Sequence, residues 1–156
     1  MFSNTVNNKL LDKKIKSLES NLKKNSQESL YKLGGLIVSD AVNKPPTPRI
    51  DTGNARGSFS ISVGNKVFEN NKKGKSLNPS LSSNPFELRV GFNMPYAKNI
   101  EFGYIINSKG KKLPMGFGVK SQNAKPSTGN FFLKTKLKNK KEIYVKKLGE
   151  FFGDTL

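Results

Sequence analysis

The sequence contains no cysteine and no histidine. Without cysteine the chain has no disulfide bond and no thiolate nucleophile or metal ligand, and it is compatible with a reducing compartment. Without histidine it also lacks the usual general base at neutral pH and the commonest protein ligand of transition metals. These absences remove the side chains on which most reactions depend. We therefore expect a protein that is not an enzyme and that holds no cofactor or metal.

Carboxylates are scarce as well, and no two of the 11 Asp and Glu residues form a convincing pair by spacing. Only Asp51 and Glu101 lie in distinctive local sequence, where they are able in principle to meet and bind a hard cation such as Mg²⁺. A structural role is the simpler interpretation, with Asp51 as a turn or cap acceptor and Glu101 as a partner of lysine or backbone amides.

Long apolar runs are also missing. A membrane-spanning helix needs about 18 or more consecutive apolar residues, whereas the longest apolar cluster near the start is Leu36-Ile37-Val38. No basic-then-apolar leader precedes it. We expect no contact with a membrane, and a length of 156 residues with 34% hydrophobic residues predicts a single domain, 1–156, with a modest core.

The chain is instead rich in lysine. Its 28 basic residues exceed its 11 acidic ones and give a formal net charge of +17. Such a field attracts nucleic acid or acidic protein surfaces, but only three of the basic residues are arginine, the side chain that matches phosphate geometry best. The sequence leaves open whether the charge is diffuse and solubilising or forms a polyanion-binding surface. The candidate contacts to DNA or an acidic partner are Lys72, Lys73, Lys75, Lys109, Lys111 and Lys112.

Two segments have helical periodicity. Residues 7–43 carry apolar residues at spacings of three and four, in one stripe at Leu11, Ile15, Leu18 and Leu22 and another at Leu30, Leu33, Ile37 and Ala41. The polar stretch 23–29 and the pair Gly34-Gly35 leave one long helix and two shorter ones both possible. Residues 132–152 predict a last helix, whose apolar face holds Leu133, Leu137, Tyr144, Leu148 and Phe151.

Between the helices, residues 58–105 predict a small antiparallel sheet. Apolar residues alternate with serine over 58–63 and with Glu87, Arg89 and Gly91 over 86–92, which is typical of strands covered on one side. A third strand is expected over 96–105. Residues 64–85 predict a long excursion, too long for a tight hairpin, with some strand near Val67-Phe68, and 104–130 an extended loop. The fold class is therefore α+β: a long N-terminal helix, a small antiparallel β-sheet with long loops, and a C-terminal helix packed on the sheet.

A stiff corner connects the first helix to the sheet at residues 45–57. Pro45, Pro46 and Pro48 end the helical pattern and fix an extended path. The turn Asp51-Thr52-Gly53 follows, in which side-chain oxygens accept backbone N–H groups and glycine is free to take a positive φ. We expect this corner to aim the strand that begins at Ser58.

These motifs, taken in order, resemble a known family. Asp51-Thr52-Gly53 is followed by Arg56 and Ser58, then by Tyr96-Ala97, then by Ile100-Glu101-Phe102-Gly103, and finally by Phe132-Leu133 with Leu137. The set is similar to that of the small neck and tail-completion proteins of tailed bacteriophages, which join the DNA-filled head to the tail. By this resemblance the interface and structural residues are Asp51, Thr52, Gly53, Arg56, Ser58, Tyr96, Ala97, Glu101, Phe102 and Gly103.

The resemblance implies a virion protein, assembled in the bacterial host cytoplasm, that forms a homo-oligomeric ring in the neck around the DNA path. Its partners would be further copies of itself, a head-side connector and the tail tube or tail terminator, with packaged double-stranded DNA as a non-specific contact. The loops 64–85 and 104–130 are the expected partner-contacting elements. The alternative from charge alone is a free-standing nucleic-acid-binding protein.

Overall fold

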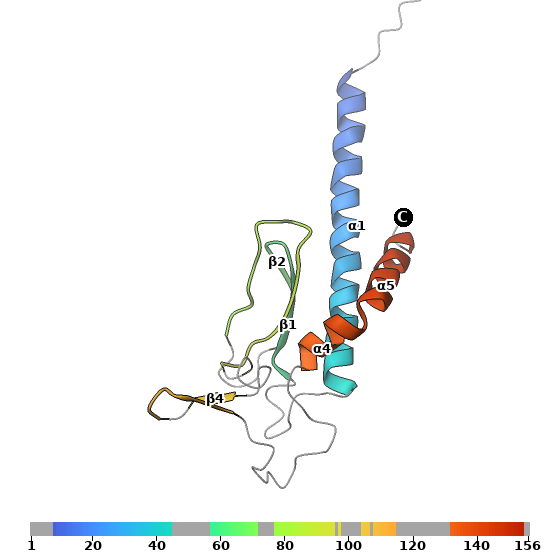
Figure 1. Cartoon of the computed structure of the whole chain (residues 1–156). Helices are drawn as coiled ribbons and strands as arrows, with labels where there is room; N and C mark the ends of the chain where they lie inside the picture. Colours follow the sequence, from blue (N-terminus) through green and yellow to red (C-terminus); the bar gives the residue numbers. More distant parts are fainter. Residues whose placement is uncertain are drawn as a thin grey trace, which may run out of the picture.

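The computed structural model describes residues 8–44, 57–71, 77–95, 97, 104–106, 108–114 and 132–154. The elements follow in the order α1 (Asn8–Asn43), β1 (Phe59–Val63), β2 (Lys66–Asn70), β3 (Leu88–Phe92), β4 (Tyr104–Ile106), β5 (Lys112–Pro114), α4 (Phe132–Asn139) and α5 (Lys141–Gly153). Figure 1 shows α1 between the sheet on one side and α5 on the other. The predicted α+β class is confirmed: a long N-terminal helix, a three-stranded antiparallel sheet and a C-terminal helical region packed against them.

The first helical segment is one continuous helix of 36 residues. It ends at Asn43, just before Pro45 and Pro46, which lack the backbone donor that a helix requires. Its two halves have different environments. The C-terminal half packs on β1 and β3, while the N-terminal half extends beyond both the sheet and α5 (Figure 1).

The main sheet has the strand order β2-β1-β3, and both pairings are antiparallel. A two-residue turn, Gly64-Asn65, connects β1 to β2, with Val63 opposite Lys66. Gly64 has a φ of 59°, in the left-handed region that such tight hairpins require. The prediction of strand near Val67-Phe68 is correct, but the expectation that 64–85 begins without a tight hairpin is wrong, because Gly64-Asn65 supplies the turn chemistry that a two-residue connection needs.

Both faces of β1 are buried, although the sequence predicted cover on one side only. Ile61 and Val63 face α1 with no exposed surface, and Ser60 and Ser62 on the opposite face are also buried. The Ser60 hydroxyl donates to Asn93 Oδ1 at 3.0 Å, and the Ser62 hydroxyl donates to the Ser80 carbonyl at 2.7 Å. The segment 77–87 thus covers the serine face, and hydrogen bonds compensate the burial of its hydroxyls.

The core forms where α1 meets the sheet and the C-terminal helices. Leu33, Ile37 and Tyr144 are its buried centre. Partly buried residues packed against them are Leu36, Leu88, Val90, Leu133, Leu148 and Phe151. Each buried aliphatic side chain of this kind contributes about 1.5–3 kcal/mol, so the C-terminal half of α1 is the centre of the fold.

The sequence predicted one continuous helix over 132–152, but the structure has two helices there, α4 and α5. Lys140 has φ −117° and ψ 16°, outside the helical region, and separates α4 from α5. The physical reason is tertiary: at this break the Lys140 ammonium reaches Asp40 on α1 at 2.7 Å. Asn139 has a low helix propensity, so little free energy is lost when the helix is interrupted beside it.

The strand predicted over 96–105 does not extend the main sheet in the described part of the chain. Tyr104–Ile106 instead pairs with Lys112–Pro114 as a separate two-stranded ribbon, so the predicted loop 104–130 begins with a hairpin. The third strand of the main sheet is β2. The local sequence pattern correctly predicted that Ile105 lies in a strand. It does not specify which strand pairs with it, because pairing depends on the tertiary structure.

Candidate functional site

Two of the ten residues assigned to the interface by resemblance fall in the described part of the chain. Ser58 is fully buried, and its carbonyl accepts from the Asn93 amide at 2.7 Å. Ala97 is buried, and its amide donates to the Met94 carbonyl at 2.9 Å. Ser58 therefore has a structural role at the start of β1, and Ala97 one in the local turn that follows β3. The other eight lie outside the described residues: Asp51, Thr52, Gly53, Arg56, Tyr96, Glu101, Phe102 and Gly103.

The six lysines predicted to contact a polyanion also lie partly inside and partly outside the described part of the chain. Lys109 and Lys111 are exposed in the turn of the β4–β5 hairpin, on either side of Gly110, whose φ is 74°. Lys112 opens β5, and its side chain is not among the described ones. Lys72, Lys73 and Lys75 lie outside the described residues. The structure thus brings two of the six lysines to one exposed turn.

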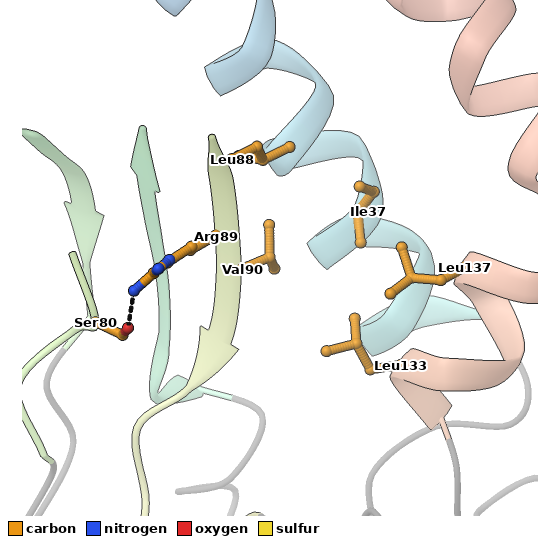
Figure 2. A pocket seen from close by; sticks show the side chains of 7 residues that line it. All are labelled: Ile37, Ser80, Leu88, Arg89, Val90, Leu133 and Leu137. Atoms are coloured by element: carbon orange, nitrogen blue, oxygen red, sulfur yellow. Dashed lines mark hydrogen bonds between the residues drawn. The ribbon is translucent and has the colours of Figure 1, made fainter. Parts of the chain in front are cut away.

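An apolar hollow of 440 Å³ lies along the outer edge of β3 (Figure 2). Its lining comes from α1, β3, α4 and the segment before β3, namely Ile37, Ser80, Leu88, Arg89, Val90, Leu133 and Leu137. Figure 2 shows Ile37, Leu133 and Leu137 gathered on the helical side of β3, whereas Arg89 points away across the sheet to Ser80. In the described part of the chain β3 is an edge strand.

Arg89 and Glu87 fasten the segment 77–87 to the sheet. The Arg89 guanidinium contacts the Ser80 hydroxyl at 2.6 Å, the Leu81 carbonyl, and Glu87 Oε1 at 2.8 Å. The Ser82 hydroxyl donates to Glu87 Oε2 at 2.6 Å. The bond from Ser82, followed by that from Arg89, holds the pKa of Glu87 below its ordinary value. Arg89 is thus used in the fold and does not form part of a separate anion site.

A cluster of ion pairs around the buried Asp40 carboxylate joins the end of α1 to the break between α4 and α5. The Asp40 carboxylate accepts from Lys140 Nζ at 2.7 Å and from the Tyr144 hydroxyl at 3.1 Å, and Lys44 Nζ lies 2.5 Å away. Burial by itself raises the pKa of Asp40, but the hydrogen bonds from Lys140, Lys44 and Tyr144 outweigh it and leave the pKa below its ordinary value of 3.8.

The pKa values of Tyr144 and Lys136 are shifted by the same surroundings. Burial, and then the charge of Asp40, raise the pKa of Tyr144 far above its usual range. Burial, and then the charge of Lys140, lower the pKa of Lys136, which is buried on α4. The cluster is an electrostatic clasp between elements about 100 residues apart in sequence (Asp40 and Lys140). Sequence reasoning missed it; the available signal was a carboxylate, Asp40, within the apolar stripe of the second half of α1.

Twelve large apolar side chains are exposed among the described residues, and most of them form two sets, each on one segment; the others are Val67, Leu137, Ile143 and Val145. One follows the projecting half of α1 and comprises Leu10, Leu11, Ile15, Leu18 and Leu22. The other lies on the segment 77–87 and comprises Leu77, Leu81 and Phe86. Large exposed apolar side chains that gather on one segment are typical of protein–protein contacts. The first set contains the helical stripe of the sequence analysis, Leu11 to Leu22, together with Leu10. In the second set, Leu77 and Leu81 lie in the predicted contact loop 64–85, whereas Phe86 opens the predicted strand 86–92.

Within the described residues, no three His, Cys, Asp or Glu side chains group as metal ligands, and none of the helices is both long and apolar enough to span a bilayer. The chain matches no protein-family model, no curated protein and no solved structure.

Proposed function

We propose that the protein is a structural subunit of the neck of a tailed bacteriophage, in which copies of it form a ring that joins the head connector to the tail. The observation that carries the proposal is the ordered series of motifs from Asp51-Thr52-Gly53 to Phe132-Leu133. The helix–sheet–helix order that this resemblance implied is also the order of the described elements.

The exposed apolar side chains of the segment 77–87 support a contact between copies. Leu77, Leu81 and Phe86 are each about half exposed. The backbone that carries them is nevertheless bonded to the sheet, because Ser80 accepts from Ser62 and Arg89 and the Ser82 amide donates to the Gly64 carbonyl. A rigid backbone that presents apolar side chains outward is a preorganised docking surface, because little entropy is lost when it binds. A head-to-tail contact of this surface with a different face of the next copy closes into a ring when the rotation fits.

The excess of positive charge is consistent with such a position. Copies of a chain with net charge +17 repel one another in a ring unless an acidic neighbour or DNA balances them. The proposed partners are a connector on the head side, the tail tube or terminator on the other, and packaged DNA contacted without sequence preference. The protein would be located in the neck region of the virion after assembly in the host cytoplasm.

The test is genetic and structural. Deletion of the coding sequence from the genome that carries it should leave DNA-filled heads and free tails that no longer join, as counted by electron microscopy. The chain supplied from a plasmid should restore joined particles, and mass spectrometry should find it in purified virions. Leu81→Asp should fail to restore joining, whereas Ser83→Asp, an exposed neighbour on the same segment, should succeed.

The opposite outcome is equally specific. Joined, infectious particles without the chain would overturn the proposal. A monomer that is absent from virions, and whose affinity for double-stranded DNA falls steeply with salt, would support the nucleic-acid-binding alternative instead.

A further inference from the structure

The N-terminal half of α1 is a helix without a covered face. Every residue from Lys9 to Lys24 is exposed, a length of 16 residues or about 24 Å. Leu11, Ile15, Leu18 and Leu22 are 49%, 45%, 67% and 57% exposed. Large apolar side chains gathered on one exposed helix face are typical of a surface that a partner covers.

The spacing of that stripe is the 4-3-4 pattern of a coiled coil. With Leu11 at position d of a heptad, Ile15 falls at a, Leu18 at d and Leu22 at the next a. A β-branched residue at a combined with leucine at d favours two parallel strands. Ile15 at a and Leu11 and Leu18 at d match this preference, whereas Leu22 at the next a does not.

The charges beside the stripe complement a second copy of the same segment. Lys14 occupies position g and Glu19 the following position e. In a parallel, in-register pair, the g residue of one helix lies beside the next e residue of the other, so Lys14 of each copy meets Glu19 of the other. The remaining lysines of this half fall at the outer positions b, c and f: Lys9, Lys13, Lys16, Lys23 and Lys24.

We infer that residues 8–25 form a parallel, in-register coiled coil with the same segment of a second copy of this chain. An antiparallel pair is disfavoured, because e positions then face each other and Asp12 would lie beside Glu19 of the other copy. The inference does not rest on the proposed function.

The first test is the oligomeric state of the full chain. Sedimentation equilibrium should detect a reversible dimer at a concentration on the order of 100 µM or below, weak because the seam spans fewer than three heptads. Leu18→Glu should raise the dissociation constant at least about tenfold, because a charge at d would be buried in the pair. Leu10→Glu is the matched control: Leu10 is also exposed, 55% against 67% for Leu18, but it lies at position c, and this variant should still dimerise. A monomeric parent chain, or equal loss in both variants, would overturn the inference.

The second test exchanges the charges. Lys14→Glu alone and Glu19→Lys alone each place like charges at both g–e contacts and should weaken self-association about tenfold, since each exposed pair contributes about 0.2–1 kcal/mol. An equimolar mixture of the two variants restores opposite charges at both contacts and should form a heterodimer as tightly as the parent. A mixture no tighter than either variant alone would refute the parallel register.

The third test uses the absence of native cysteine. Asn8→Cys places a single thiol at the a position that opens the segment. Parallel pairing brings the two thiols together and should give a disulfide-linked dimer on mild oxidation, whereas in an antiparallel pair they lie about 26 Å apart. Failure to crosslink while the dimer persists would exclude the parallel arrangement. Absence of the chain from virions would overturn the proposed function without changing any of these three results.

Discussion

Gly34 lies where α1 comes closest to the sheet, and it offers a sharp test of the packing. A Cβ atom added at Gly34 would meet Ile61 Cγ2 at 2.6 Å, Leu88 Cδ1 at 3.1 Å and Val90 Cγ2 at 3.5 Å. A Cβ added at the next residue, Gly35, would meet nothing within 4 Å. The two glycines share one helix and one backbone conformation, so the same substitution probes the contact with the sheet in one case and only helix propensity in the other.

The magnitude follows from two opposing terms. Alanine is more favourable than glycine inside a helix by about 1 kcal/mol, and this gain applies to both sites. At Gly34 the new methyl group must displace Ile61, which is fully buried and stiff because it is branched at Cβ. Overpacking of this kind costs about 1–3 kcal/mol. We therefore expect Gly35→Ala to stabilise the protein by up to about 1 kcal/mol and Gly34→Ala to be less stable than Gly35→Ala by about 1–3 kcal/mol.

Urea unfolding followed by far-UV circular dichroism measures this difference. With a slope of about 2 kcal/mol per M, a difference of about 2 kcal/mol separates the two midpoints by about 1 M urea. Both variants must be compared at one protein concentration, because self-association adds to the stability of the folded state. Gly34→Ala as stable as Gly35→Ala, with an unchanged slope, would refute the close contact between α1 and β1.

A double-mutant cycle isolates the contact itself. Ile61→Ala removes Cγ2 and leaves space beside residue 34, so Gly34→Ala should be tolerated better in that background than in the parent. The interaction free energy between the two changes should be favourable and in the range of about 0.5–3 kcal/mol that residues in contact show. Simple additivity would mean that the methyl group at 34 never reaches Ile61.

Three further outcomes are expected. Gly64→Ala should lower the free energy of unfolding by at least about 1 kcal/mol in the same urea assay, because Gly64 has a φ of 59° and a Cβ there would meet the backbone of Pro85 at 2.8 Å. Asp40→Asn should lower the free energy of unfolding by about 2 kcal/mol at neutral pH, since it removes the buried charge that Lys140 and Tyr144 contact. An unchanged free energy of unfolding would mean that this cluster does not stabilise the fold. The pKa of Asp40 is lower in the folded state than its ordinary 3.8, so its stabilisation is fully present above that value and is lost as the pH falls through the folded-state pKa. Acid unfolding monitored between pH 6 and pH 2 should therefore show a smaller loss in Asp40→Asn than in the parent, and equal losses would contradict the assignment.

Much of the architecture was predictable from local pattern. The helical spacing across 7–43, the prolines that end it and the alternation in 58–63 and 86–92 are properties of short windows of sequence, and the structure has α1, β1 and β3 in those positions. The chemistry excluded by the missing cysteine and histidine is also a property of composition alone.

Other features depend on residues distant in sequence. Both stripes of α1 have helical spacing, yet only the second is covered, because β1, β3 and Tyr144 reach that half and leave Leu11 to Leu22 exposed. The alternation in β1 predicted that its serines face solvent. The segment 77–87 instead covers them, and the Ser62 hydroxyl donates to the Ser80 carbonyl.

The sequence by itself determined that 7–43 is helical and that 58–63 and 86–92 contain strands, and it set the excess of positive charge, since each of these depends on neighbouring residues or on counting. The tertiary structure alone decided which apolar stripe is buried, where the last helix breaks, and that Asp40 meets Lys140 across 100 positions of chain. The physical reason is that burial and ion pairing are properties of contacts between distant segments, and no periodicity within a segment specifies the surface that will cover it.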